Sequence, residues 1–213
     1  FSSGTEFGKS IPNSWSNDAD MKEQAKKLQK NILENLEQNQ RIVIPFGWAG
    51  TNPHAIGLCI EKIPTSNTYN LIVINTSGSS YHRYLPDPNN VYPHLARLWI
   101  EFKNIPHSEL FSDNYWFMYP MMIFKNDGIL KEMEPATGSI ENYFYGSILS
   151  NFKNYLAPLD KSTKKLVPHQ RSGSCTLSSM MAAYLYYAKD EVEFHKDKVI
   201  IGHCMLDRFL TKY

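Results

Sequence analysis

An apolar stripe with steps of three and four residues near the start of the chain predicts an amphipathic helix. The stripe follows Asn17 and Asp18, either of which can cap the helix, and Lys and Glu side chains occupy the opposite face. Its apolar members are Met21, Ala25, Leu28, Ile32 and Leu36. We expect the helix to pack on the rest of the domain by this stripe.

Three runs that are rich in β-branched and alternating apolar residues come next and predict strands. The first covers residues 41–46 and is expected to end at Pro45. The other two, residues 54–60 and 69–75, are separated by a short polar loop and predict two adjacent antiparallel strands.

Helical spacing returns in the second half of the chain. One predicted helix is capped by Ser139 and ends before Pro158. Its apolar face consists of Ile140, Phe144, Ile148, Phe152 and Tyr155. Shorter helices are expected over residues 95–100, after Cys175 and over residues 199–210, whereas residues 115–124 fit either edge strands or buried irregular structure. The order of helix, strands and helices indicates the α+β class.

The composition is that of an ordinary globular domain. With 213 residues, 42% of them hydrophobic and 13% aromatic, the chain can bury one core. We expect a single domain over residues 1–213, with residues 1–16 as a flexible lead-in. Because the chain does not begin with Met, we leave open that it is one domain of a longer protein.

Charge and cysteine content narrow the class of protein. The formal net charge of +1 lacks the basic excess of a nucleic-acid binder, and no apolar run is long enough for a membrane span. Three scattered cysteines make neither a disulfide framework nor a zinc site, so a reducing compartment such as the cytoplasm is expected. No phosphate-binding glycine loop and no metal-ligand spacing is present, and we expect no cofactor and no metal.

Cys175 is the first candidate for chemistry. It follows a loop rich in Gly and Ser and precedes an apolar helix, and the amide groups at a helix N-terminus stabilise a thiolate. Gln170, five residues earlier, can donate a hydrogen bond to a developing oxyanion. The alternative is that Cys175 is a small buried residue and Gln170 an ordinary loop residue. Cys59, on a predicted strand, and Cys204, in a predicted helix, are interpreted as core thiols.

His54 and Asn75 are candidates for a base and for the residue that orients it. His54 opens one predicted strand and Asn75 closes the next, so antiparallel pairing brings both to the same edge of the sheet. The alternative makes His54 a strand-end residue and Asn75 a turn former. For either residue taken alone, the turn and strand-end interpretation is favoured.

Taken together, these residues resemble the ubiquitin-like protease clan of cysteine peptidases. That clan has the same order of His, acidic or amide residue, Gln and Cys, and the resemblance covers residues 54–75 and 170–187. It implies a papain-like α+β fold with a central mixed sheet and the nucleophile at the N-terminus of a buried helix. Carried over, Cys175 is the nucleophile, His54 the base and Gln170 the oxyanion donor, with Asn75 where the clan usually has a carboxylate.

Two positions depart from the pattern of the clan. Ala55 follows His54 where the clan usually has Trp, and Thr176 follows Cys175 where it usually has Gly. Trp48 is a candidate to replace the missing Trp or to wall a substrate tunnel, and it fits equally a core position or a loop aromatic. Tyr81 is a second candidate for the substrate groove.

The resemblance implies a protein substrate. It suggests a monomeric isopeptidase or deubiquitinase that cleaves after the C-terminal glycine of ubiquitin or a ubiquitin-like modifier, and a bacterial effector that acts inside a host cell is compatible with it. Two alternatives stay open: a YopJ-type acyltransferase that uses the same three residues with acetyl-CoA, and an inactive binding module of the same fold.

Overall fold

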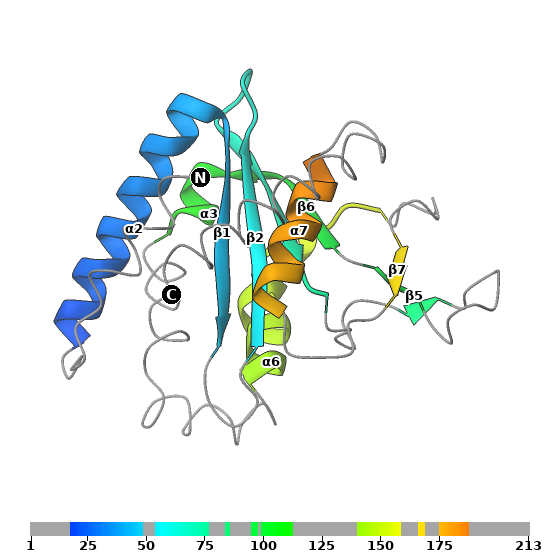
Figure 1. Cartoon of the computed structure of the whole chain (residues 1–213). Helices are drawn as coiled ribbons and strands as arrows, with labels where there is room; N and C mark the ends of the chain where they lie inside the picture. The colour runs from blue at the N-terminus through cyan, green and yellow to red at the C-terminus, as the bar shows by residue number, and fades with distance from the viewer. Residues whose placement is uncertain are drawn as a thin grey trace, which may run out of the picture.

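A four-stranded antiparallel sheet lies at the centre of the structure (Figure 1). The structure is a computed structural model that describes residues 18–48, 54–76, 84–85, 95–97, 99–112, 140–158, 166–168 and 175–187. The strands, in spatial order, are β1 (Arg41–Trp48), β2 (His54–Lys62), β3 (Thr68–Ile74) and β6 (Trp99–Pro106). The class is α+β, as expected.

The sheet differs from the expected mixed sheet, because every strand pair among the described residues is antiparallel. The first three strands follow one another in the sheet, and the chain then returns so that β6 runs antiparallel to β3. A second, small antiparallel sheet has the order β4 (Tyr84–Leu85), β5 (Leu95–Arg97) and β7 (Leu166–Pro168).

Two local predictions for strands and helices are wrong. Pro45 does not end β1, which continues to Trp48; β1 is the edge strand of its sheet, and there the missing N–H of an exposed proline is tolerated. Residues 95–100 are not helical, because residues 95–97 form β5 and Trp99 begins β6 by pairing with Ile74. Strand pairing overrides the weak helical pattern of this short segment.

Helices cover both faces of the sheet. One face packs against α2 (Asp18–Asn39), α3 (His107–Leu110) and the helical stretch that follows α6 (Ile140–Tyr143). The other face packs against α7 (Cys175–Tyr187), which crosses in front of β2 in Figure 1. Alternation along β2 serves both layers: Ile56 and Leu58 belong to the first core and Cys59 to the second.

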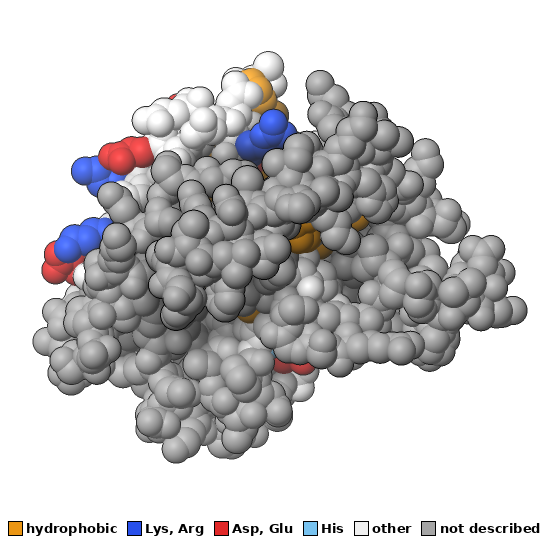
Figure 2. Space-filling model, in the orientation of Figure 1, with side chains coloured by type: hydrophobic (Ala, Val, Ile, Leu, Met, Phe, Trp, Pro, Cys, Tyr) orange, Lys and Arg blue, Asp and Glu red, His pale blue; other side chains and the backbone are white. Residues whose placement is uncertain are grey.

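The structure confirms the apolar stripe that was predicted for the first helix. Ala25, Leu28, Ile32 and Leu36 are buried, while the side chain of Met21 lies outside the described residues. Charged side chains cover the outer face of α2 and gather at the corresponding edge of the molecule in Figure 2. None of the helices in the described residues is both long and apolar enough to span a membrane.

The predicted helix over residues 140–155 is divided into three segments. After α6 come the π-helical turn η1 (Phe144–Ile148) and the 3₁₀ segment η2 (Leu149–Tyr155). Phe144 and Phe152 are buried as expected. The predictions for residues 1–16, 115–124 and 199–210 fall outside the described part of the chain.

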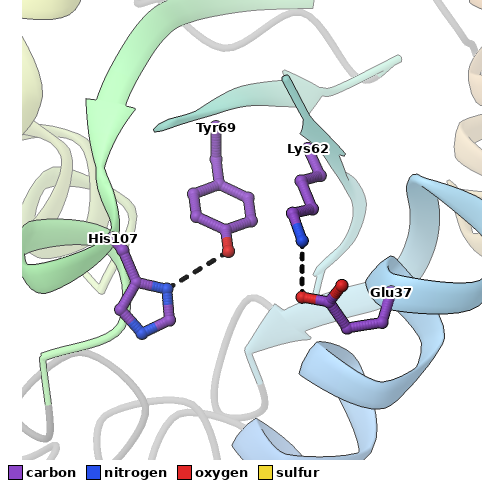
Figure 3. A network of polar contacts seen from close by, with 4 residues as sticks. All are labelled: Glu37, Lys62, Tyr69 and His107. Atoms are coloured by element: carbon purple, nitrogen blue, oxygen red, sulfur yellow. Dashed lines mark hydrogen bonds and ion pairs between the residues drawn. The ribbon is translucent and has the colours of Figure 1, made fainter. Parts of the chain in front are cut away.

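A polar network closes the end of the sheet that lies away from His54 (Figure 3). The Tyr69 hydroxyl is 3.2 Å from His107 Nδ1, and Lys62 Nζ is 2.5 Å from Glu37 Oε1. Burial raises the pKa of Tyr69. The network joins the last turn of α2 to the β2–β3 hairpin and to α3, so this end of the sheet is tied to the helical layer.

Candidate active site

His54 and Asn75 are in direct contact at the edge of the sheet where β2 begins and β3 ends. The distance from His54 Nε2 to Asn75 Oδ1 is 2.9 Å. Gly57 pairs with Ile74, and continuing this register puts Asn75 diagonal to His54, within reach of a side-chain contact. His54 is half-buried and Asn75 is completely buried.

The contact defines which ring nitrogen carries the proton. An amide oxygen only accepts hydrogen bonds, so His54 Nε2–H is the donor to Asn75 Oδ1. In the neutral ring Nδ1 then holds the lone pair and is the basic atom. This is the arrangement that a general base requires when a third residue orients it.

Asn75 is held from its other side by Tyr145, which lies in η1. Asn75 Nδ2 donates a hydrogen bond of 3.0 Å to the Tyr145 hydroxyl, and the contact is buried. Both ends of the amide are therefore engaged, the oxygen with His54 and the nitrogen with Tyr145. A buried amide that is bonded at both ends is restrained in position.

Trp48 covers the imidazole of His54. The two residues are opposite each other in the β1–β2 register, and their ring centroids are 5.3 Å apart in an edge-on arrangement. Trp48 is 7% exposed and also packs near Phe144, at 6.1 Å between ring centroids. Its ring therefore shields the His54 side of the site instead of lining an open surface.

The helix α7 is joined to β2 beside His54. Ser179 is completely buried, and its hydroxyl donates a hydrogen bond of 3.2 Å to the main-chain oxygen of Ala55. Gly57 permits the close approach, because a Cβ atom there would lie 3.3 Å from Met180 Cε. Further along, Tyr187 at the end of α7 lies beside Cys59. Helix and strand thus run in the same direction, and both begin at the same end of the sheet (Figure 1).

This orientation brings the start of α7 to the level of His54. Cys175 is the first residue of the helix, one turn before Ser179 and on the same helical face. The four residues from Cys175 to Ser179 rise about 6 Å along the axis, which equals about two residues of a strand. Counted back from Ala55, that distance ends one residue before His54, the first residue of β2, so the start of α7 lies within about one strand residue of the level of His54.

The remaining predicted site residues lie outside what the structure describes. Gln170 and Tyr81 are not among the described residues, and Cys175 is described as the first residue of α7 but not in its side chain. The structure therefore brings together Trp48, His54 and Asn75, and it places the helix that begins at Cys175 next to them.

Cys59, the cysteine on β2, has the properties of a core thiol. It is completely buried against α7, and burial raises the pKa of its thiol to about 12. A thiol with so high a pKa is neutral at physiological pH and is not a nucleophile. The interpretation of Cys59 as core is confirmed, while Cys204 lies outside the described residues.

Two residues of the site were missed in the sequence. Tyr145 lies next to Phe144 in the helical pattern, where the neighbour of an apolar position is expected to turn away from the core. Ser179 is a polar residue in an apolar helix at four positions from Cys175, which is a weak signal for a buried hydroxyl on the same face.

Chemically, the arrangement offers an oriented histidine and no evident metal site. In the part of the chain that the structure covers, no three His, Cys, Asp or Glu residues are grouped so as to hold a metal ion. Comparison of the chain with protein-family models, with curated proteins and with solved structures gives no match.

Proposed function

We propose that this protein is a thiol hydrolase in which Cys175, His54 and Asn75 act as nucleophile, base and orienting residue. The observation that carries the proposal is the His54–Asn75 hydrogen bond, which lies at the end of the sheet where both β2 and α7 begin. The resemblance to the ubiquitin-like protease clan supports the same assignment of roles.

The proposed reaction divides amide cleavage into two steps. The Cys175 sulfur attacks the carbonyl carbon while His54 Nδ1 takes the thiol proton, and the tetrahedral oxyanion accepts hydrogen bonds from the Cys175 amide and from Gln170. The C–N bond then breaks as His54 returns the proton to the leaving amine. Water, deprotonated by His54, cleaves the thioester, and the carboxylic acid leaves with Cys175 regenerated.

Asn75 and Trp48 have supporting roles in this reaction. Asn75 Oδ1 accepts a hydrogen bond from Nε2–H in both the neutral and the charged ring, so the ring keeps one orientation while Nδ1 gains and loses its proton. Trp48 keeps water from the His54–Asn75 contact. By the resemblance, the substrate is the C-terminal glycine of ubiquitin or a ubiquitin-like modifier joined to a lysine.

The test is covalent labelling with ubiquitin and SUMO that carry an electrophile at the C-terminus. The full chain, its Cys175→Ala variant and a Cys59→Ala control are incubated with each probe and analysed by mass spectrometry. We expect one adduct with the wild type and with Cys59→Ala, and none with Cys175→Ala. An adduct that survives Cys175→Ala would overturn the proposed nucleophile.

The other outcomes separate the alternatives. If no modifier probe reacts but acetyl-CoA acetylates Cys175, the acyltransferase replaces the peptidase. If neither reagent modifies Cys175, the protein is a binding module of this fold, and the proposed hydrolase is wrong.

A further inference from the structure

The helical turn η1 supports both residues of the His54–Asn75 pair at once. Phe144 packs at 5.0 Å from Phe46 and at 6.1 Å from Trp48, the residue whose ring lies against His54. The next residue, Tyr145, bonds Asn75. Both Phe144 and Tyr145 are buried, at 3% and 6% exposure, although consecutive residues of an α-helix point in different directions.

The π-helical geometry of this turn accounts for the double burial. Residues 144–148 form a π-helical turn between α6 and the 3₁₀ segment η2. Such turns are wider than those of an α-helix, cost backbone regularity and occur frequently at functional sites. Here the wider turn lets two consecutive aromatic side chains face the same edge of the sheet.

We infer that Tyr145 is a positioning residue that holds the Asn75 amide with its oxygen toward His54 and thereby keeps the proton on Nε2 of the ring. An amide can present either its oxygen or its nitrogen to a neighbour, unlike a carboxylate, whose two oxygens both accept. With Asn at this position the correct orientation has to be selected. In the structure the Tyr145 hydroxyl accepts from Nδ2 at 3.0 Å in a buried contact, which leaves Oδ1 facing His54. A hydroxyl can also donate, so the selection requires that the Tyr145 hydroxyl proton is directed away from the amide. The catalytic consequence rests on the proposed function, whereas the tautomer of His54 does not.

The charged ring makes the selection more important. When His54 gains a proton on Nδ1, both ring nitrogens are donors, and the group beside Nε2 has to be an acceptor. An Asn75 amide turned the other way would place its N–H₂ group against the Nε2–H group and disfavour the imidazolium. A carboxylate always presents an acceptor oxygen to Nε2–H because both of its oxygens accept. An Asn75 amide does so only in one orientation, and Tyr145 holds it in that orientation.

The first experiment measures the tautomer of His54 directly. Long-range ¹H–¹⁵N correlation spectra of the neutral ring distinguish Nε2–H from Nδ1–H in the full chain. We expect the Nε2–H form in the wild type and a rise of the Nδ1–H form in Tyr145→Phe. Tyr155→Phe is the matched control, because its hydroxyl bonds Glu109 at 2.7 Å on the exposed side of the same helical stretch and touches neither His54 nor Asn75.

A double-mutant comparison isolates the amide orientation. In an Asn75→Asp background either oxygen can face His54, so adding Tyr145→Phe is expected to leave the tautomer unchanged. An unchanged tautomer in Tyr145→Phe alone, or an equal change in both backgrounds, would overturn the inference. Thermal melts of all variants show whether each is folded.

A second measurement needs no substitution. The Nδ2 protons of Asn75 in the wild type are expected to exchange slowly with water, because they are buried and donate to Tyr145. Rapid exchange would overturn the inference even if Tyr145→Phe failed to fold. If the labelling experiments also support the hydrolase, Tyr145→Phe is expected to slow Cys175 alkylation by roughly threefold to tenfold, the effect of one net hydrogen bond. A changed tautomer without reactive Cys175 would mean that the proposed function fails while the positioning role stands.

Discussion

The Ser179 hydroxyl donates a hydrogen bond of 3.2 Å to the main-chain oxygen of Ala55, the residue that follows His54. This contact joins the helix that begins at Cys175 to the strand that begins at His54. It connects the two halves of the candidate site, which are far apart in the sequence. The separation of Ser179 and Ala55 is 124 residues.

Removing this contact is expected to weaken both stability and reactivity. Ser179→Ala deletes a buried hydroxyl, and one such hydrogen bond contributes about 0.5–1.5 kcal/mol to the free energy of unfolding. Urea unfolding measures that loss, and alkylation of Cys175 is expected to slow in parallel. Ser108→Ala, at an exposed position of α3, is the control and is expected to change neither quantity. Unchanged stability in Ser179→Ala would show that the contact does not hold α7 in place.

The close pairing of β1 and β2 beside His54 predicts a sharp difference between two glycine substitutions. A Cβ atom at Gly47 would collide with the main-chain oxygen of His54, whereas one at Gly57 would meet the flexible end of Met180 at 3.3 Å. Backbone cannot give way as a side chain can, so we expect Gly47→Ala to lower the free energy of unfolding by about 1–3 kcal/mol, the range for overpacking. Gly57→Ala is expected to cost clearly less. Equal losses in urea unfolding would contradict this account of the strand pair.

Cys59 predicts a loss of stability at high pH. In the unfolded chain the thiol ionises near 9.0, and in the folded protein burial raises its pKa to about 12. Above pH 9 the unfolded state therefore loses a proton that the folded state keeps, so the stability that is complete below pH 9 falls as the pH rises toward 12. Between pH 8 and pH 10 this thiol removes about 1.4 kcal/mol from the free energy of unfolding.

The comparison of wild type with Cys59→Ala measures this contribution. Urea unfolding under reducing conditions at pH 8 and pH 10 gives the pH-dependent loss for each protein, and the difference between the two losses belongs to Cys59. Burial is the largest cause that raises the pKa values of Tyr186 and Tyr187, and Cys59 is a further cause for both, so the difference also contains the coupling of Cys59 to these two tyrosines. Identical pH dependence in the two proteins would contradict the burial of Cys59.

The contact between His54 and Asn75 could be predicted from the sequence because the register of a hairpin is a local property. Two adjacent alternating runs joined by a short loop define a hairpin, and the ends of its strands then meet at one edge. The stripe of the first helix was accessible for the same reason, since a period of 3.6 residues directly marks the buried face.

Tyr145 and Pro45 show why other features of the fold and the site could not be predicted from the sequence. Tyr145 meets Asn75 across 70 residues, and its burial depends on a π-helical turn that an α-helical pattern does not contain. Pro45 is a strand breaker by propensity, yet it lies within β1 because β1 is an edge strand, which is a property of the whole sheet. The predicted roles of Gln170 and Tyr81 stay predictions.

The most direct test of the central claim is the rate at which Cys175 reacts with iodoacetamide at neutral pH, with and without His54. Mass spectrometry of the peptides resolves Cys59, Cys175 and Cys204, and His107→Ala at the opposite end of the sheet is the matched histidine control. We predict that Cys175 reacts fastest of the three cysteines and that His54→Ala slows it by about tenfold or more, while His107→Ala does not. A Cys175 rate that is unchanged in a folded His54→Ala protein would contradict the proposed pairing of Cys175 with His54.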